Sequence, residues 1–222
     1  MATRVTRFGL VNCYLIEEED GLTLVDTMLP RSDKVILEAG KRLGREIRRI
    51  ALTHAHQDHH GSLDALAAAL PDAEVLISAR DARLLAGEKK LDPAEDLRGA
   101  KLRGAYTGAK TKPTRTVGAG DRIGSLEVIE APGHTPGHVA YMDTRDRTLY
   151  CGDAYSTLGG VATAAKMNPR FPLVYMATWH RPTALVTARA LRTLDPAALA
   201  PGHGKVIDDP GAAMERAIAQ AS

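Results

Sequence analysis

The sequence has 222 residues, 44% hydrophobic and 25% charged, which is an ordinary composition for a globular protein with a sizeable core. A formal net charge of +2 and an aromatic content of 4% argue against nucleic-acid binding through bulk electrostatics or base stacking. Two cysteines cannot form a disulfide framework, and we find neither a signal-peptide core nor about 18 consecutive apolar residues, so we expect a soluble cytoplasmic protein without a membrane span.

The first half of the chain is predicted to begin with strands and to continue with alternating strands and helices. Apolar runs bounded by turn residues predict four strands, at 11–17, 22–26, 47–52 and 74–78. Helices are expected from residues 30–32 to about Leu43, at 63–70 and at 79–85.

The segment 87–115 is irregular and rich in lysine and arginine. It is the best candidate for a connection between two halves of a single domain spanning residues 1–222. Whether this basic segment contacts a ligand remains open, because a run of charges is more often a solvated face.

The second half is predicted to contain short strands followed by helices. Strands are expected at 116–117, 126–131, 139–143, 148–151 and 199–200, and helices at about 183–194 and 212–220. Strands interleaved with helices indicate sheets covered by helices, which is an α/β layer architecture.

The strongest chemical signal is a cluster of histidines directly after the strand 47–52. His54, His56, Asp58 and His59 lie within six residues. Imidazole and carboxylate groups are the ligands that zinc, iron and manganese prefer. A histidine-rich surface loop is the alternative, but few chains with eight histidines would cluster them in this way without a metal.

Three later loops each place one further candidate ligand after a predicted strand. His134 lies in the Pro- and Gly-rich loop 131–138, Asp153 follows Cys151-Gly152, and His203 lies in a Pro-Gly turn. Alone, each could be a turn residue, a helix cap or a hydrogen-bonded side chain. Together they resemble ligands that converge on one edge of a sheet.

This arrangement resembles the metallo-β-lactamase superfamily. His54-x-His56-x-Asp58-His59 is similar to the signature of that family, the later ligands follow in the same order, and the strand 22–27 resembles its early motif. The resemblance covers nearly the whole chain and implies a four-layer αββα sandwich.

The resemblance also implies a division of the ligands between two divalent metal ions. One ion is bound by His54, His56 and His134; the other is bound by Asp58, His59 and His203; and Asp153 bridges both. Asp26 is expected either to support a ligand or to occupy a turn or cap, and His138 either to support a ligand or to pack. His60 is expected at a helix cap or on the surface.

The implied activity is hydrolysis, in which a hydroxide held between two metals attacks an ester-like bond. Zinc is the expected metal, with iron or manganese as alternatives, and Asp58 is expected to accept or relay the proton. An aspartate at 153 resembles glyoxalase-II-type thioesterases and lactonases, whereas related zinc β-lactamases usually carry Cys or Ser there. The chain ends soon after His203, so we expect no extra C-terminal helical domain of the glyoxalase II type.

The substrate is expected to be a small molecule, a lactone or a thioester, bound by loop 154–181. That loop holds the only tryptophan and several apolar side chains, although it could instead be a packed connection. The alternatives are a phosphodiesterase that uses the segment 89–115, and an oxygenase with a single iron like the persulfide dioxygenases of the family. A non-enzymatic binding module is disfavoured because all seven ligand positions are filled.

Overall fold

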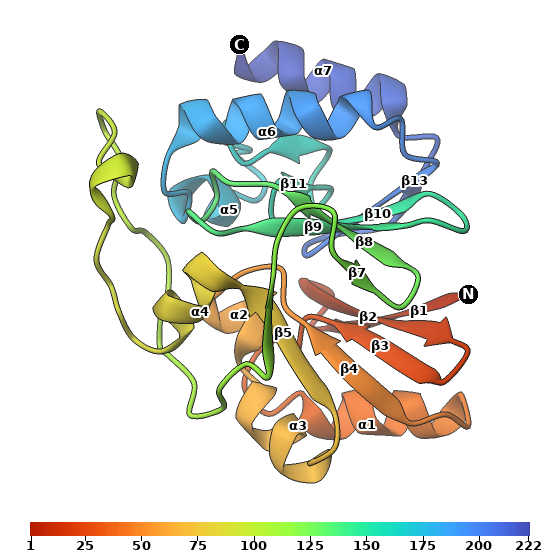
Figure 1. Cartoon of the computed structure of the whole chain (residues 1–222). Helices are drawn as coiled ribbons and strands as arrows, with labels where there is room; N and C mark the ends of the chain where they lie inside the picture. The colour runs from red at the N-terminus through yellow and green to blue at the C-terminus, as the bar shows by residue number, and fades with distance from the viewer.

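The computed structural model describes all 222 residues and contains two six-stranded sheets that pack face to face between layers of helices (Figure 1). The first sheet has the order β1 (Ala2–Arg7), β2 (Val11–Glu18), β3 (Gly21–Val25), β4 (Ile47–Ala51), β5 (Glu74–Ser78) and β6 (Arg115–Val117). The second has the order β14 (Ile207–Asp208), β13 (Ala198–Pro201), β10 (Thr148–Gly152), β9 (Val139–Asp143), β8 (Leu126–Glu130) and β7 (Arg122–Ile123). A small third sheet pairs β11 (Tyr155–Ser156) with β12 (Ala162–Thr163).

Helices cover the outer face of each large sheet (Figure 1). The first half contributes α1 (Asp33–Arg42), α2 (Gln57–His60), α3 (Leu63–Ala69), α4 (Ala79–Leu85) and the short 3-10 helix η1 (Pro93–Glu95). The second half contributes α5 (Leu173–Met176), α6 (Arg181–Thr193) and α7 (Gly211–Ala221). The αββα sandwich that the resemblance implied is therefore confirmed. None of the helices has the length and apolar character that a membrane span requires.

Successive residues of the inner strands supply the cores on the two faces of a sheet, since side chains along a strand alternate in direction. In β2, Cys13 and Leu15 join the core under α1 and α3, whereas Tyr14 and Ile16 join the core between the sheets. In β10, Tyr150 lies between the sheets and packs edge-on against Tyr14, with ring centroids 5.1 Å apart. One apolar core thus joins the two sheets.

The chain passes from the first sheet to the second between β6 and β7. The segment 87–115, which we expected to connect the halves, comes just before this point and leads into β6, the last strand of the first sheet. Apart from the short helix η1, it is irregular.

The topology brings the carboxyl ends of five strands to one edge of the sandwich. Strand β3 runs parallel to β4 and β10 runs parallel to β13, while β8 and β10 are both antiparallel to β9. The loops that leave these strand ends carry the residues singled out in the sequence.

Candidate metal centre

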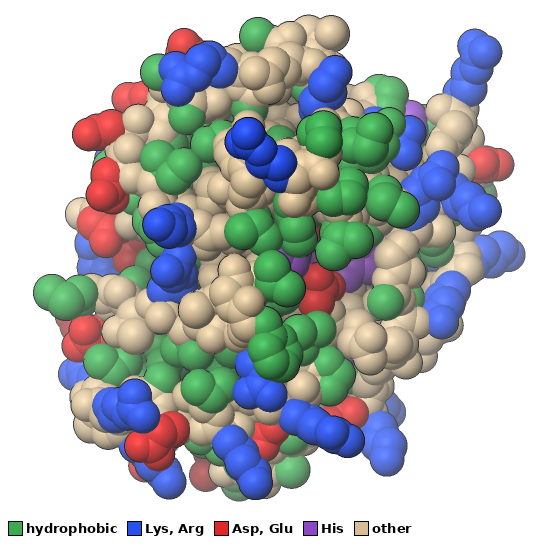
Figure 2. All heavy atoms as spheres, turned by 180° about the vertical axis from the view of Figure 1, so that it is seen from behind, with side chains coloured by type: hydrophobic (Ala, Val, Ile, Leu, Met, Phe, Trp, Pro, Cys, Tyr) green, Lys and Arg blue, Asp and Glu red, His purple; other side chains and the backbone are tan.

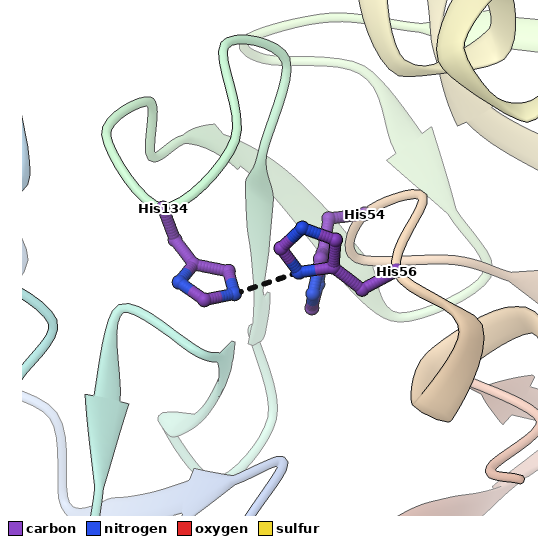
Figure 3. A group of neighbouring side chains, drawn as sticks. All are labelled: His54, His56 and His134. Atoms are coloured by element: carbon purple, nitrogen blue, oxygen red, sulfur yellow. Dashed lines mark hydrogen bonds between the residues drawn. The ribbon is translucent and has the colours of Figure 1, made fainter. Parts of the chain in front are cut away.

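All seven predicted metal ligands come together at this edge. Their side-chain nitrogens and carboxylate oxygens form three overlapping groups whose members lie within 4.8 Å of one another. The groups are His54, His56 and His134; His54, His59 and Asp153; and Asp58, His59 and His203. Figure 3 shows the first group, in which His134 approaches from the loop after β8, and His54 and His56 from the loop after β4.

The rings of His56 and His134 are held by acceptors behind the cluster. His56 Nε2 lies 2.8 Å from the carbonyl oxygen of Arg103, so that nitrogen carries the proton and Nδ1 is free. The Thr178 hydroxyl donates to the Val174 carbonyl at 2.7 Å and can accept from His134 Nδ1 at 3.1 Å. The two free nitrogens, His56 Nδ1 and His134 Nε2, lie 2.9 Å apart (Figure 3).

Asp26 and its neighbour Thr53 orient two further ligands. The Asp26 carboxylate accepts the Thr53 hydroxyl at 2.8 Å and lies 2.8 Å from His59 Nδ1. His54 Nδ1 can in turn donate to the Thr53 hydroxyl at 3.0 Å. Both histidines therefore present Nε2 to the cluster, and Asp26 has the supporting contacts that the sequence left open.

Asp58 and His203 form the outer side of the cluster. Nδ1 of His203 lies 2.8 Å from the carbonyl oxygen of Leu10, which leaves Nε2 free 3.4 Å from an Asp58 oxygen. The Asp58 side chain is 36% exposed, whereas His59 and His203 are buried, so Asp58 is the most solvent-accessible of these three candidate ligands.

Asp153 lies between the group of His54, His56 and His134 and the group of Asp58, His59 and His203. One of its oxygens is 3.4 Å from His59 Nε2, and the other is 3.4 Å from His134 Nε2 and 3.3 Å from His203 Nε2. The backbone N–H of Asp153 donates to His138 Nε2 at 3.1 Å, so His138 supports Asp153. These contacts suit a bridging position.

Asp81 is a supporting residue that the sequence did not reveal. Its buried carboxylate accepts the Ala55 N–H at 2.8 Å, the Thr135 hydroxyl at 2.7 Å and the Gly137 N–H at 2.8 Å. Burial raises the pKa of Asp81 to about 6, opposed by these hydrogen bonds. The residue ties together the two loops that carry His54, His56 and His134; in the sequence it looks only like an acid in the first turn of a helix.

The electrostatics divide the histidines into two kinds. Burial lowers the pKa of His54 and His134 well below the usual value, so both are neutral, as metal ligands must be. Burial acts the same way on His203, but Asp153 and Asp58 outweigh it and raise its pKa to about 10. Carboxylates thus make the outer side of the cluster a favourable place for a cation.

Three buried atoms of the cluster, His54 Nε2, His59 Nε2 and Asp153 Oδ1, have no hydrogen-bond partner. Buried polar groups are nearly always satisfied, so unpartnered atoms that converge indicate a ligand. The donor set of imidazoles and carboxylates suits zinc, iron or manganese. The residues therefore fit divalent metal ions.

His60 and the two cysteines lie outside the ligand set. The expectation of a cap or surface role for His60 is wrong, because the residue is buried at the end of α2. Burial raises the pKa of the thiols of Cys13 and Cys151, which keeps both thiols protonated and poorly reactive.

A cleft of about 460 Å³ opens over the cluster. Figure 2 shows histidine and acidic side chains at the bottom of a hollow with hydrophobic side chains around it. The cleft is lined by Asp58, Asp153, His56 and His203, and by apolar residues that include Leu29, Leu173, Val174 and Met176.

Comparison with known proteins places these residues in a family. Residues 6–203 match the model of the metallo-beta-lactamase superfamily. The chain is 44% identical over 214 residues to the uncharacterized protein YobT of Bacillus subtilis (strain 168), covering 95% of this chain and 90% of that protein. It is 35% identical over 134 residues to a hydroxyacylglutathione hydrolase of Rhodospirillum rubrum, a match that spans 59% of this chain and only 42% of that protein.

Solved structures agree with the fold. TTHA1623 in a di-iron-bound form is 25% identical, with a TM-score of 0.68 and coverage of 95% of this chain and 96% of that one. The BLEG-1 B3 metallo-beta-lactamase superposes with a TM-score of 0.71 over 95% of both chains, but at 19% identity this likeness concerns the fold alone.

Proposed function

The chain belongs to the metallo-β-lactamase superfamily, and we propose that it is a hydrolase with two divalent metal ions that cleaves a lactone or a thioester. The observation that carries this proposal is the cleft over the metal centre. Its wall is apolar, and no lysine or arginine lines it.

We assign the two ions to the ligand sets that the geometry suggests. His54, His56 and His134 would hold one ion, Asp58, His59 and His203 the other, and Asp153 would contact both. When bound, such ions polarise the scissile carbonyl and make water acidic enough to lose a proton near neutral pH. Zinc, iron and manganese all suit these donors, and the di-iron form of TTHA1623 supports iron as an alternative to zinc.

The protein's own groups supply orientation and proton transfer. Asp58 is a partly exposed carboxylate that lines the cleft, and it would accept the proton of the attacking water and return it to the leaving group. Asp26 and Thr53 fix the rings of His59 and His54, so the ligand atoms need no rearrangement during turnover.

The apolar side chains of helix α5 favour the proposal of a substrate with an acyl group. Leu173 and Met176 are each 59% exposed at the cleft, and Val174 lies buried beneath them. Large apolar side chains left in water beside a polar centre mark a binding surface for an apolar group. The relatives named hydroxyacylglutathione hydrolase, whose name describes an acyl derivative of glutathione as substrate, point in the same direction.

A phosphodiesterase is the second candidate. Recognition of a phosphodiester normally uses arginine or lysine aimed at the reacting group, and the cleft has neither. The basic segment lines the cleft only with Gly104 and Ala105, and the backbone N–H groups of Lys110 and Thr111 donate to the Asp64 carboxylate in α3.

The test is a comparison of kcat/KM for an acyl-homoserine lactone, a glutathione thioester, bis-p-nitrophenyl phosphate and a β-lactam. We expect the lactone or the thioester to be preferred. The double variant Leu173→Ser/Met176→Ser should raise KM for long acyl chains, whereas Val186→Ser, which removes an equally exposed apolar side chain from α6, should not. Turnover of the phosphodiester alone would replace this proposal with the second candidate.

A further inference from the structure

A second hollow lies beside the metal centre and has the opposite character from the apolar cleft. It encloses about 210 Å³ and is lined by three arginines, Arg98, Arg103 and Arg181, together with Trp179 and His180. No acidic residue lines it. We call this hollow the arginine pocket.

The arginines of the pocket have no counter-charge within the protein. None of the three forms an ion pair, whereas Arg80, Arg83 and Arg145 are each paired with a carboxylate. The guanidinium of Arg181 stacks on the ring of Tyr175 at 3.8 Å, which fixes its orientation. Three unpaired positive charges that line one hollow favour an anion within it.

Two donors in the walls of the pocket are buried without an acceptor. Trp179 is only 5% exposed, and its indole Nε1 has no hydrogen-bond partner; the same is true of Nε of Arg181. A buried donor without a partner carries a free-energy cost that a bound acceptor removes. The pocket also contains the first residues of the 13-residue helix α6, whose N-terminal dipole favours negative charge.

Residues in the walls of the pocket are hydrogen-bonded to two residues of the metal centre. Arg103 accepts the ring proton of His56 through its backbone carbonyl at 2.8 Å, and Trp179 donates its backbone N–H to the carbonyl of His134 at 2.8 Å. The next residue along one wall, Gly104, lines the apolar cleft. A molecule in the cleft could therefore extend a charged tail into the pocket.

We propose that the arginine pocket binds a carboxylate or phosphate group, and that this group is part of the substrate. The second part rests on the proposed function: the substrate is then an ester-like molecule with an apolar portion at α5 and an anionic group at Arg98, Arg103 and Arg181. The pocket holds this group apart from the metals, so it positions the substrate and does not react.

Trp179 provides a direct test of the first part, because it is the only tryptophan in the chain. Inorganic phosphate titrated into the metal-loaded protein should give a saturable change in tryptophan fluorescence. The Kd should rise about 10-fold or more in Arg103→Gln and Arg181→Gln, as expected for loss of a charge-assisted hydrogen bond. Arg98→Gln, at an exposed position, should act in the same direction, and Arg216→Gln, exposed on α7, should leave the Kd unchanged.

An equal Kd in the wild type and the three pocket variants would show that phosphate binds elsewhere, for example at the metals. This result would overturn the proposal that the arginine pocket binds an anion. A titration without any saturable signal would overturn it as well.

A pair of esters tests the second part. The selectivity for mono-(4-nitrophenyl) glutarate over neutral 4-nitrophenyl butyrate, as a ratio of kcat/KM, should fall at least about 10-fold in Arg103→Gln and Arg181→Gln. If phosphate binding weakens but this ratio is constant, the pocket takes a free anion and its assignment to the substrate is wrong. If the wild type hydrolyses neither these esters nor the lactone and the thioester of the first assay, the proposed function fails, while the fluorescence titration still decides whether the pocket binds an anion.

Discussion

At the scale of single residues, Asp153 differs from the other six candidate ligands because its two oxygens approach histidines of both metal groups. We predict that Asp153→Ala lowers activity at least about 100-fold and reduces metal content while the fold survives. Asp26→Ala should reduce the metal content less than Asp153→Ala does, since Asp26 contacts His59 only at Nδ1, on the side of the ring away from the cluster. Metal content, steady-state rates and circular dichroism of both variants check this prediction; full metal content and turnover in Asp153→Ala would show that the residue does not bridge.

A glycine beside the cluster provides an independent test of the same geometry. A Cβ on Gly202 would collide with the ring of His59 and lie 2.6 Å from Asp153 Oδ1. Gly202→Ala should therefore displace two ligands and reduce metal affinity by about 10- to 100-fold, the range seen when ligand orientation is lost. Gly118→Ala is the matched control, because a Cβ there meets nothing within 4 Å. Metal titrations that give the same affinity for both variants would contradict the arrangement of His59 and Asp153.

At the scale of elements, the centre depends on loops from different sheets being held in register, and Asp81 at the start of α4 joins two of them. Asp81→Ala leaves the Ala55 and Gly137 amides without an acceptor, which costs about 1–3 kcal/mol for such buried groups. We predict a lower Tm, by about 2–4 °C per kcal/mol for a chain of this length, together with weaker metal binding. Asp96→Ala, at an exposed position, should change neither property. If the Tm and the metal affinity of Asp81→Ala equal those of the wild type, Asp81 does not support the site.

The elements that were predicted and those that were missed differ in their local signals. Strands β5 and β9 begin and end at the predicted residues, because each is an apolar run bounded by turn or helix signals. Strand β1 was missed: only Val5 in it is buried, and its position depends on antiparallel pairing with β2. The short helix α5 was also missed, because a helix of four residues is too short to show a helical period.

The residues of the site also divide into those that local sequence signals predict and those that only tertiary packing brings together. Residue type and spacing were enough to predict the seven residues that the structure brings together, because five histidines and two aspartates after strands are rare. The contacts of Asp81 with residues 55, 135 and 137, and the meeting of Arg103 with Arg181, depend on tertiary packing across long stretches of sequence. No local pattern reports such contacts.

At the scale of the whole molecule, the two sheets share one core and also share the metal centre. The Tyr141 hydroxyl on the second sheet donates to the Leu52 carbonyl, 2.6 Å away and two residues before the first ligand. Asn12 on the first sheet donates to the carbonyl oxygens of Pro201 and Gly204, on either side of His203. Metal binding should therefore stabilise the fold as a unit, and neither half should bind metal alone.

Removal of the metal should thus lower the Tm. Free metal at 100 times its Kd adds about 2.7 kcal/mol to the stability of the folded state, which corresponds to about 5–10 °C for a chain of this length. Scanning calorimetry before and after treatment with a chelator, and again after addition of zinc, measures this difference. Asp153→Ala should show a smaller shift, whereas a Tm that does not respond to chelator would mean that the ligand cluster contributes nothing to stability through metal binding.

The central claim is that this cluster holds two metal ions. Elemental analysis of protein purified without added metal tests it most directly. We predict about two ions of zinc, iron or manganese per chain, because seven donors are enough for two open sites that share a carboxylate. A reproducible single iron per chain, with oxygen consumed when a thiol persulfide is added, would contradict the account and make the protein an oxygenase.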